Sequence, residues 1–219
     1  MDFSQIETDI LGKTISFVKD ALKTAESGHD WWHISRVVAN AENIGKAYPE
    51  SNLFIVKMVA LLHDVDDWKF KEQIKQNKSE EFLKSLQIDQ VIIDQILSAI
   101  EKISFKGSGV SDEIESLEGK IVQDADRLDA LGAIGIARCF SYGGFRNREI
   151  FNPEKPFKMH NSFEEYKSNN GTSINHFYEK LLLLKDRMKT GKGKELAQAR
   201  HDYMVGYLEK FMKEWEGQA

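Results

Sequence analysis

The feature that most constrains the fold is an apolar segment that ends in charged residues, "NLFIVKMVALLHDVDDWKF" at 52–70. Its first half is apolar nearly all round, which predicts a central, buried helix. Four ionisable side chains follow at once: His63, Asp64, Asp66 and Asp67. Burying charge is costly unless something compensates it, so the sequence requires a partner for these groups.

His-Asp pairs occur three times, at 29–30, 63–64 and 201–202, and so short a motif means little without its context. The pair at 201–202 lies among polar residues on a helix that we expect to be exposed. Asp30 suits the start of a helix, where an acid interacts favourably with the macrodipole. Only His63-Asp64 ends a wholly apolar helix, so a ligand role makes energetic sense there.

Two further groups complete a set of metal ligands. His33 lies beside an apolar helix face that begins with Ile34 and Val37, although a histidine in that place is more often a satisfied core residue. Asp126 lies in "VQDADRLDALGA", where spacings of three and four put one set of residues on a single helix face. That set is Val122, Asp126, Asp129 and Ala133.

The alternative for Asp126 is an ordinary helix residue, because Asp124 and Arg127 resemble a surface pair. Two imidazoles and two carboxylates from three helices suit a divalent ion such as Mn²⁺, Fe²⁺, Ni²⁺, Co²⁺ or Mg²⁺. The ion would supply the positive charge that the buried acids lack. Spacing alone thus leaves two interpretations open: one divalent metal ion with His33, His63, Asp64 and Asp126 as its ligands, or satisfied core and helix residues.

Composition narrows the class of protein. The 219 residues are 41% hydrophobic and 30% charged, which is typical of a single globular domain, here 1–219. The net charge of −5 does not favour a nucleic-acid polymer or an anionic membrane as partner. No apolar run reaches the roughly 18 residues of a membrane span. The single cysteine, Cys139, is expected to be buried and inert, and with the acidic start "MDFSQIETDI" it predicts a cytoplasmic protein.

The pattern predicts an all-α fold. A capping box at Ser4 and Glu7 begins a helix that should end near Ser27-Gly28. The further expected helices are 29–47, 52–65, 80–86, 89–103, 116–140, 172–190 and 192–216. Gly132 and Gly135 lie inside the long helix, where they would allow close contact with a neighbour. The irregular stretch 145–170 is long enough to predict a lid over the site.

These motifs resemble those of the HD-domain metal-dependent phosphohydrolases, whose pattern is His, then His-Asp, then a distant Asp. The strings that carry the resemblance are "GHDWWHI", "ALLHDVDDWKF", "ISFKG" and "VQDADRLDALGAIGIAR". They are similar to those of a bacterial cytoplasmic single-domain subfamily, and the likeness runs from Ser27 to Tyr203. It implies an HD-domain-like helical bundle, with metal-site helices at about 27–144 and two additional C-terminal helices at 172–216.

The resemblance also suggests catalytic roles. Asp67 stands where several such enzymes carry an acid that orients or deprotonates the attacking water. Alarmone hydrolases add a second acid at the next position, where this chain has Trp68, so an alarmone is a poor candidate substrate. Asp66 has no role in the family pattern and is expected to be a solvated residue. Lys69 is a second catalytic candidate, and the candidates for substrate binding are His29, Arg36, Lys106 and Arg146, with Arg148 beside it.

The implied reaction is hydrolysis of a small phosphorylated metabolite, most simply a nucleotide. One form is cleavage of a nucleoside triphosphate to a monophosphate and pyrophosphate. The alternatives are a 5′-nucleotidase, a metal-dependent nucleotide-binding module without turnover, and a helical scaffold. Four ligands indicate one metal ion, because the remaining histidines that a two-iron oxygenase would need (His160, His176 and His201) all follow Asp126.

Overall fold

The structure is a computed structural model, and it describes residues 3–23, 30–66, 77–103, 113–158 and 171–218. Within these ranges every regular element is a helix and none is a strand, so the prediction of an all-α fold is confirmed. No helix there combines the length and the apolar character needed to cross a membrane. The chain divides into two compact units, Met1–Phe105 with Asp112–Ala125, and Lys106–Ser111 with Asp126–Ala219.

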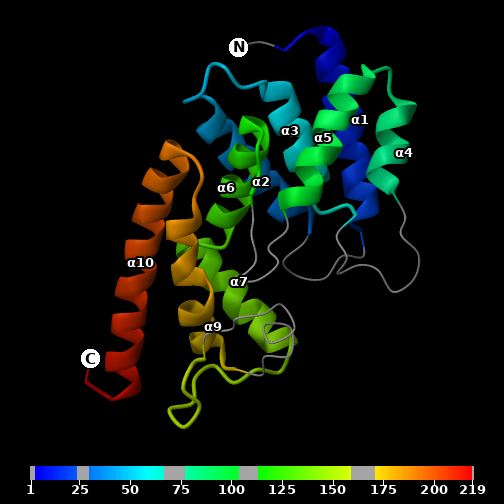
Figure 1. The fold of residues 1–219 in the computed structure, drawn as a ribbon. Coiled ribbons are helices and arrows are strands. Elements are labelled where there is room, and N and C mark those ends of the chain that lie inside the picture. The colour runs from blue at the N-terminus through cyan, green and yellow to red at the C-terminus, as the bar shows by residue number, and fades with distance from the viewer. Residues whose placement is uncertain (1–2, 24–29, 67–76, 104–112, 159–170, 219) are drawn as a thin grey trace. The chain divides into compact units, whose positions relative to one another are not determined.

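The first unit is built around a short apolar helix, as predicted. Its elements are α1 (Gln5–Ala21), α2 (Trp31–Gly45), α3 (Leu53–Leu62), α4 (Lys78–Ser85), α5 (Gln90–Ile103) and most of α6 (Leu117–Asp129). Helix α3 contacts α1, α2 and α5 (Figure 1). With neighbours on three sides, it needs apolar residues around its circumference, and all but Leu53 and Lys57 are buried.

Side-chain caps set where these helices begin. Ser4 and Glu7 form the predicted capping box at α1, and Asp30 caps α2 by accepting a hydrogen bond from the His33 backbone N–H at 2.9 Å. Asn52 caps α3 through the N–H groups of its first turn. Helix α1 ends at Ala21, earlier than the predicted end near Ser27, because Leu22 already leaves the helical conformation.

Asp66 has a structural role that was not predicted. Its two carboxylate oxygens accept hydrogen bonds from the backbone N–H groups of Lys78 and Ser79, at 3.0 and 2.9 Å. Asn77, at the cap position of α4, makes no such bond itself. Asp66 therefore caps α4 from a distance of 12 residues along the chain, and is not a solvated helix-end residue.

The second unit holds the end of α6 and the C-terminal helices. These are α7 (Gly132–Phe145), α9 (Ser173–Glu179), the 3₁₀ helix η2 (Leu181–Arg187) and α10 (Gly191–Trp215). Helix α10 contacts α7 and η2, and α9 contacts both α7 and η2 (Figure 1). The long final helix agrees with the prediction of 192–216.

The predicted helix 116–140 is wrong, because the chain breaks it into α6 and α7. Leu131 is extended, with φ −116° and ψ 161°, and Gly132 has φ +69°, a conformation that favours glycine. A Cβ atom on Gly135 would clash with the carbonyl oxygen of Ala130. The two glycines thus permit the break, and Ala133 does not continue the face that carries Asp126.

The predicted helix 172–190 is also wrong, because it changes type at Lys180. That residue has φ −141° and ψ −59°, and the chain continues as a 3₁₀ helix. Leu181 and Leu184 are both buried there, and three-residue spacing puts them on one face of a 3₁₀ turn. Four consecutive leucines supply apolar contacts for either helix type, so the pattern could not distinguish them.

The first part of the predicted lid is attached to α9. The backbone N–H groups of Ser173 and Ile174 donate to the carbonyls of Glu149 and Ile150, at 2.9 and 3.0 Å. Asn175 donates through its side-chain amide to the carbonyl of Lys155 at 2.9 Å. The lid role of 145–170 stays a prediction, and residues 159–170 lie outside the described part of the chain.

The break between α6 and α7 predicts opposite effects for two glycine substitutions. Gly132→Ala should lower the free energy of unfolding by about 1–2 kcal/mol, because alanine is strained at positive φ. Its Cβ would also press on Arg200, whose Cγ lies 3.1 Å from that position. Gly206→Ala, on α10 with open space around it, should raise stability by up to about 1 kcal/mol. Urea denaturation of both variants measures this, and equal stabilities would contradict the account of the break.

Candidate metal centre

His33 is held at the start of α2. The carboxylate of Asp30 accepts from the His33 backbone N–H, so the capping bond fixes the first turn that carries the imidazole. The side chain then points inward with the apolar face of the helix, next to Ile34 and Val37. His33 is 1% exposed.

His63 and Asp64 directly follow the apolar helix α3. The His63 backbone N–H donates to Val59, and the ring Nδ1 lies 2.9 Å from the carbonyl oxygen of Ala60. Because a carbonyl only accepts hydrogen bonds, this contact puts the ring proton on Nδ1. The Nε2 atom of His63 then keeps a lone pair that can bind a metal ion.

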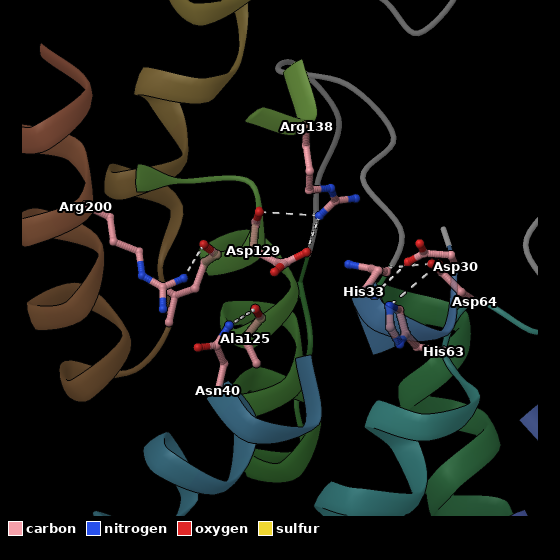
Figure 2. Close-up of polar contacts among 10 residues, drawn as sticks. Asp30, His33, Asn40, His63, Asp64, Ala125, Asp129, Arg138 and Arg200 are labelled. Carbon is pink, nitrogen blue, oxygen red and sulfur yellow. Dashed lines mark hydrogen bonds and ion pairs between the residues drawn. The ribbon is translucent and has the colours of Figure 1, made fainter. Parts of the chain in front are cut away.

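The three side chains form one buried cluster (Figure 2). The Nε2 atom of His33 lies 3.4 Å from Oδ2 of Asp64, and the Nε2 atom of His63 lies 3.6 Å from Oδ1. The two imidazole rings are 5.5 Å apart, edge to face. One donor atom from each residue falls within 4.8 Å of the other two, and His63 and Asp64 are only 4% and 5% exposed.

The donor set fits a divalent metal ion. Metal–ligand bonds of about 2.1 Å in a tetrahedral site put two donors roughly 3.4 Å apart, close to the N···O separations of 3.4 and 3.6 Å between the imidazoles and Asp64. Imidazole nitrogens suit transition metals, and a carboxylate adds a hard oxygen ligand. A cation would also offset the burial of the Asp64 carboxylate. A metal ion bound by this cluster would therefore be the compensating partner that His63 and Asp64 require.

Asp126, the predicted fourth ligand, lies on α6 and is half-buried. It belongs to the second unit, and its role as a ligand stays a prediction. The residue before it, Ala125, is joined to α2 in the first unit, because the Asn40 side chain donates to its carbonyl at 3.4 Å (Figure 2).

The interpretation of Asp124 and Arg127 as a surface pair is wrong. Asp124 is completely buried and Arg127 is 5% exposed. The guanidinium of Arg127 donates to the backbone carbonyl of Arg187, at the end of η2. Polar residues on α6 are thus buried more widely than a simple two-faced helix would suggest, which is why the charge pattern misled.

A second cluster of charge gathers where α6 ends. Asp129 is 1% exposed, and Arg138 on α7 donates to its carboxylate at 2.5 Å and to its backbone carbonyl (Figure 2). Arg200 on α10 donates to the carbonyl of Leu128. Two guanidinium groups thus bind the last carbonyls of α6, at the negative end of its dipole. No local pattern identified these partners, because each comes from a helix beyond the break.

The remaining predicted site residues are spread along the chain. Arg36 is half-buried on α2, one turn after His33. Arg146 is exposed at the C-terminus of α7, in the second unit. His29, Asp67, Lys69 and Lys106 lie outside the described residues, so their roles stay predictions.

Cys139 is buried, as predicted. Its Sγ lies 3.4 Å from the carbonyl oxygen of Ser173, to which the thiol can donate. Burial raises the pKa of this thiol to about 12, so it stays protonated at neutral pH and is a poor nucleophile.

Comparison with known proteins agrees with this geometry. The HD domain profile matches residues 31–131, which include all three clustered residues. An HD-superfamily hydrolase from Bacillus thuringiensis is 42% identical, with a TM-score of 0.77 over 97% of this chain and 100% of that one. A structure from Lactobacillus plantarum is 34% identical, with a TM-score of 0.83 over 99% and 100% of the two chains. The chain belongs to the HD-domain family of metal-dependent phosphohydrolases.

YpgQ from Bacillus subtilis is a third relative of the same family. It is 36% identical over 205 residues, which are 92% of each chain. A crystal structure of YpgQ in complex with ADP matches with a TM-score of 0.76 over 96% of this chain and 97% of that one. Family membership confirms the resemblance on which the predicted metal ligands rested.

The cluster predicts which His-Asp pair holds metal. Elemental analysis of the purified protein should find about one divalent ion per chain, because the donor set matches a single ion. His63→Ala and Asp64→Ala should each abolish it. His201→Ala and Asp202→Ala, in the pair on α10, should leave it unchanged. Full metal content in both His63→Ala and Asp64→Ala would exclude this centre.

Proposed function

We propose that this phosphohydrolase acts on nucleotides and cleaves a nucleoside triphosphate to the monophosphate and pyrophosphate. The observation that supports the proposal is the buried cluster of His33, at the start of α2, with His63 and Asp64, which follow the apolar helix α3, because these three residues could hold one metal ion. Asp126 would complete the set.

A divalent ion in this centre would lower the pKa of a bound water and polarise a phosphoryl oxygen. The protein side chains would do the remaining work. Asp67 would hold the attacking water in line and accept its proton as the new P–O bond forms. The bond from the α-phosphorus to the bridging oxygen breaks at the same time, and pyrophosphate leaves with that oxygen.

Asp66 and Asp67 are both candidates for the base that accepts the proton of the attacking water. Asp66 uses both carboxylate oxygens to cap α4, so it already has a structural partner on each oxygen. This leaves Asp67 as the candidate base in the segment after the His-Asp pair. Lys69 would neutralise charge on the transferring phosphoryl group.

The remaining cationic candidates would bind the outer phosphates. Arg36 is the best placed in the described residues, because it follows His33 by one turn of the same helix. His29, Lys106 and Arg146 stay candidates from the sequence. A nucleotide, rather than another phosphorylated metabolite, is supported by the ADP complex of the relative YpgQ.

A panel of nucleotides tests the proposed reaction. The protein with Mn²⁺ would be given nucleoside tri-, di- and monophosphates, and phosphate would be measured with and without added pyrophosphatase. Phosphate from triphosphates that depends on pyrophosphatase supports the proposal. Phosphate from monophosphates without pyrophosphatase would indicate the alternative, a 5′-nucleotidase. Binding of nucleotides with no phosphate under any condition would indicate a module without turnover.

Neighbouring acids should give opposite results when the carboxylate is removed. Asp67→Asn keeps the shape but not the base, so kcat should fall by about 10²- to 10⁴-fold, with KM and metal content little changed. Asp66→Asn should retain most of kcat, because its amide oxygen can still accept one of the two capping hydrogen bonds and the residue has no proposed role in the chemistry. Steady-state kinetics and elemental analysis measure both effects. Loss of kcat in Asp66→Asn alone, or loss of metal in Asp67→Asn, would show that the roles are assigned wrongly.

A further inference from the structure

The adjacent tryptophans at the start of α2 have different environments. Trp31 is half-buried, and the ammonium of Lys19 lies 4.6 Å from its ring centroid. Trp32 is 66% exposed. An exposed tryptophan offers a wide, rigid apolar face to solvent, and here it immediately precedes His33 of the metal cluster. Packing within the described protein does not account for Trp32 as it does for Trp31.

The helical geometry relates Trp32 to two residues of the proposed site. At 100° per residue, Arg36 lies about 40° around α2 from Trp32, and His33 about 100° from it in the same direction. The guanidinium of Arg36 therefore starts from a position between the indole and the ligand imidazole. An aromatic face, a cation and a metal ligand follow one another around a single turn of helix.

We propose that Trp32 stacks on the base of the bound nucleotide, while the phosphates extend past Arg36 toward the metal cluster. The inference rests on the proposed function and adds the residue that binds the base. Stacking on an aromatic face is favourable for purines and pyrimidines alike. Trp32 therefore contributes affinity for nucleotides as a class, with little preference among bases.

The residues around Trp32 on α2 favour a single ring, rather than a partner helix, as the group that packs on its indole. A partner helix would need apolar anchors that repeat at three- and four-residue intervals. The residues at those intervals are Ser35, Arg36 and Ala39, which are small or charged. Among the described residues of this unit, the other exposed large apolar side chains, Ile6 and Val91, belong to α1 and α5. Helix α2 thus presents one aromatic side chain beside a cation, which suits a nucleotide better than a protein surface.

The test compares a ligand that has a base with its counterpart that lacks one. Isothermal titration calorimetry in saturating Mn²⁺ would use α,β-methylene-ADP and methylenediphosphonate, neither of which is readily hydrolysed at its bridging carbon. Trp32→Ala should weaken the affinity for the nucleotide analogue by about 5- to 150-fold. Its affinity for the diphosphonate should stay within about twofold of the wild-type value. Trp32→Phe should recover most of the affinity. Trp215→Ala, which removes an exposed tryptophan on α10, should change neither.

Unchanged affinity of Trp32→Ala for the nucleotide analogue would overturn the inference, as would an equal loss for both ligands. The hydrolysis panel with the wild-type protein tests the proposed function separately. Turnover of nucleotides with no loss of affinity in Trp32→Ala would refute the stacking role alone. Because Trp32 is exposed, its substitution should leave the fold intact, and the unchanged diphosphonate affinity is the internal check.

Discussion

The burial of one carboxylate, that of Asp64, is the constraint on which the site depends. Its oxygens lie 3.4 and 3.6 Å from the Nε2 atoms of His33 and His63, in a place that is almost closed to solvent. A buried carboxylate is strongly unfavourable unless a positive charge compensates it. A divalent cation bound by all three residues would supply that charge. The same ion is what the chemistry of the HD-domain family requires.

The architecture of the first unit follows from this requirement. Helix α3 packs against α1, α2 and α5, so His63 and Asp64 at its end lie in the interior. The carbonyl of Ala60 orients the His63 ring. The Asp30 cap holds His33 on the adjacent helix. Asp66, two residues after Asp64, caps the N-terminus of α4. Of the four ionisable residues that follow α3, His63 and Asp64 belong to the buried cluster, Asp66 caps α4, and Asp67 stays the proposed base.

Most of the first unit could be predicted because its signals are local. The capping box at Ser4 and the apolar run of α3 each depend on residues close in sequence. The errors arose where distant residues decide the structure. The break at Gly132 depends on a backbone conformation and on packing against Arg200, and neither alters the periodicity of the side chains. The partners of Asp66 and Asp129 lie 12 and nine residues away, beyond the reach of helical spacing rules.

The burial of polar groups suggested a metal site, and the resemblance to the HD-domain family assigned its ligands, of which Asp126 stays a prediction. The exposure of Trp32 does not follow from the sequence, since a tryptophan near a helix end is more often a core residue. Its 66% exposure, beside the buried His33, suggests a division of the helix between substrate binding and metal binding. This division would let one helix contact both the base and the phosphates of a nucleotide.

Anomalous X-ray diffraction from crystals grown with Mn²⁺ tests the central claim most directly. The account predicts a single strong peak bonded by Nε2 of His33, Nε2 of His63, a carboxylate oxygen of Asp64 and one of Asp126. A peak bound by other residues, or none at this cluster in crystals saturated with the ion, would contradict it.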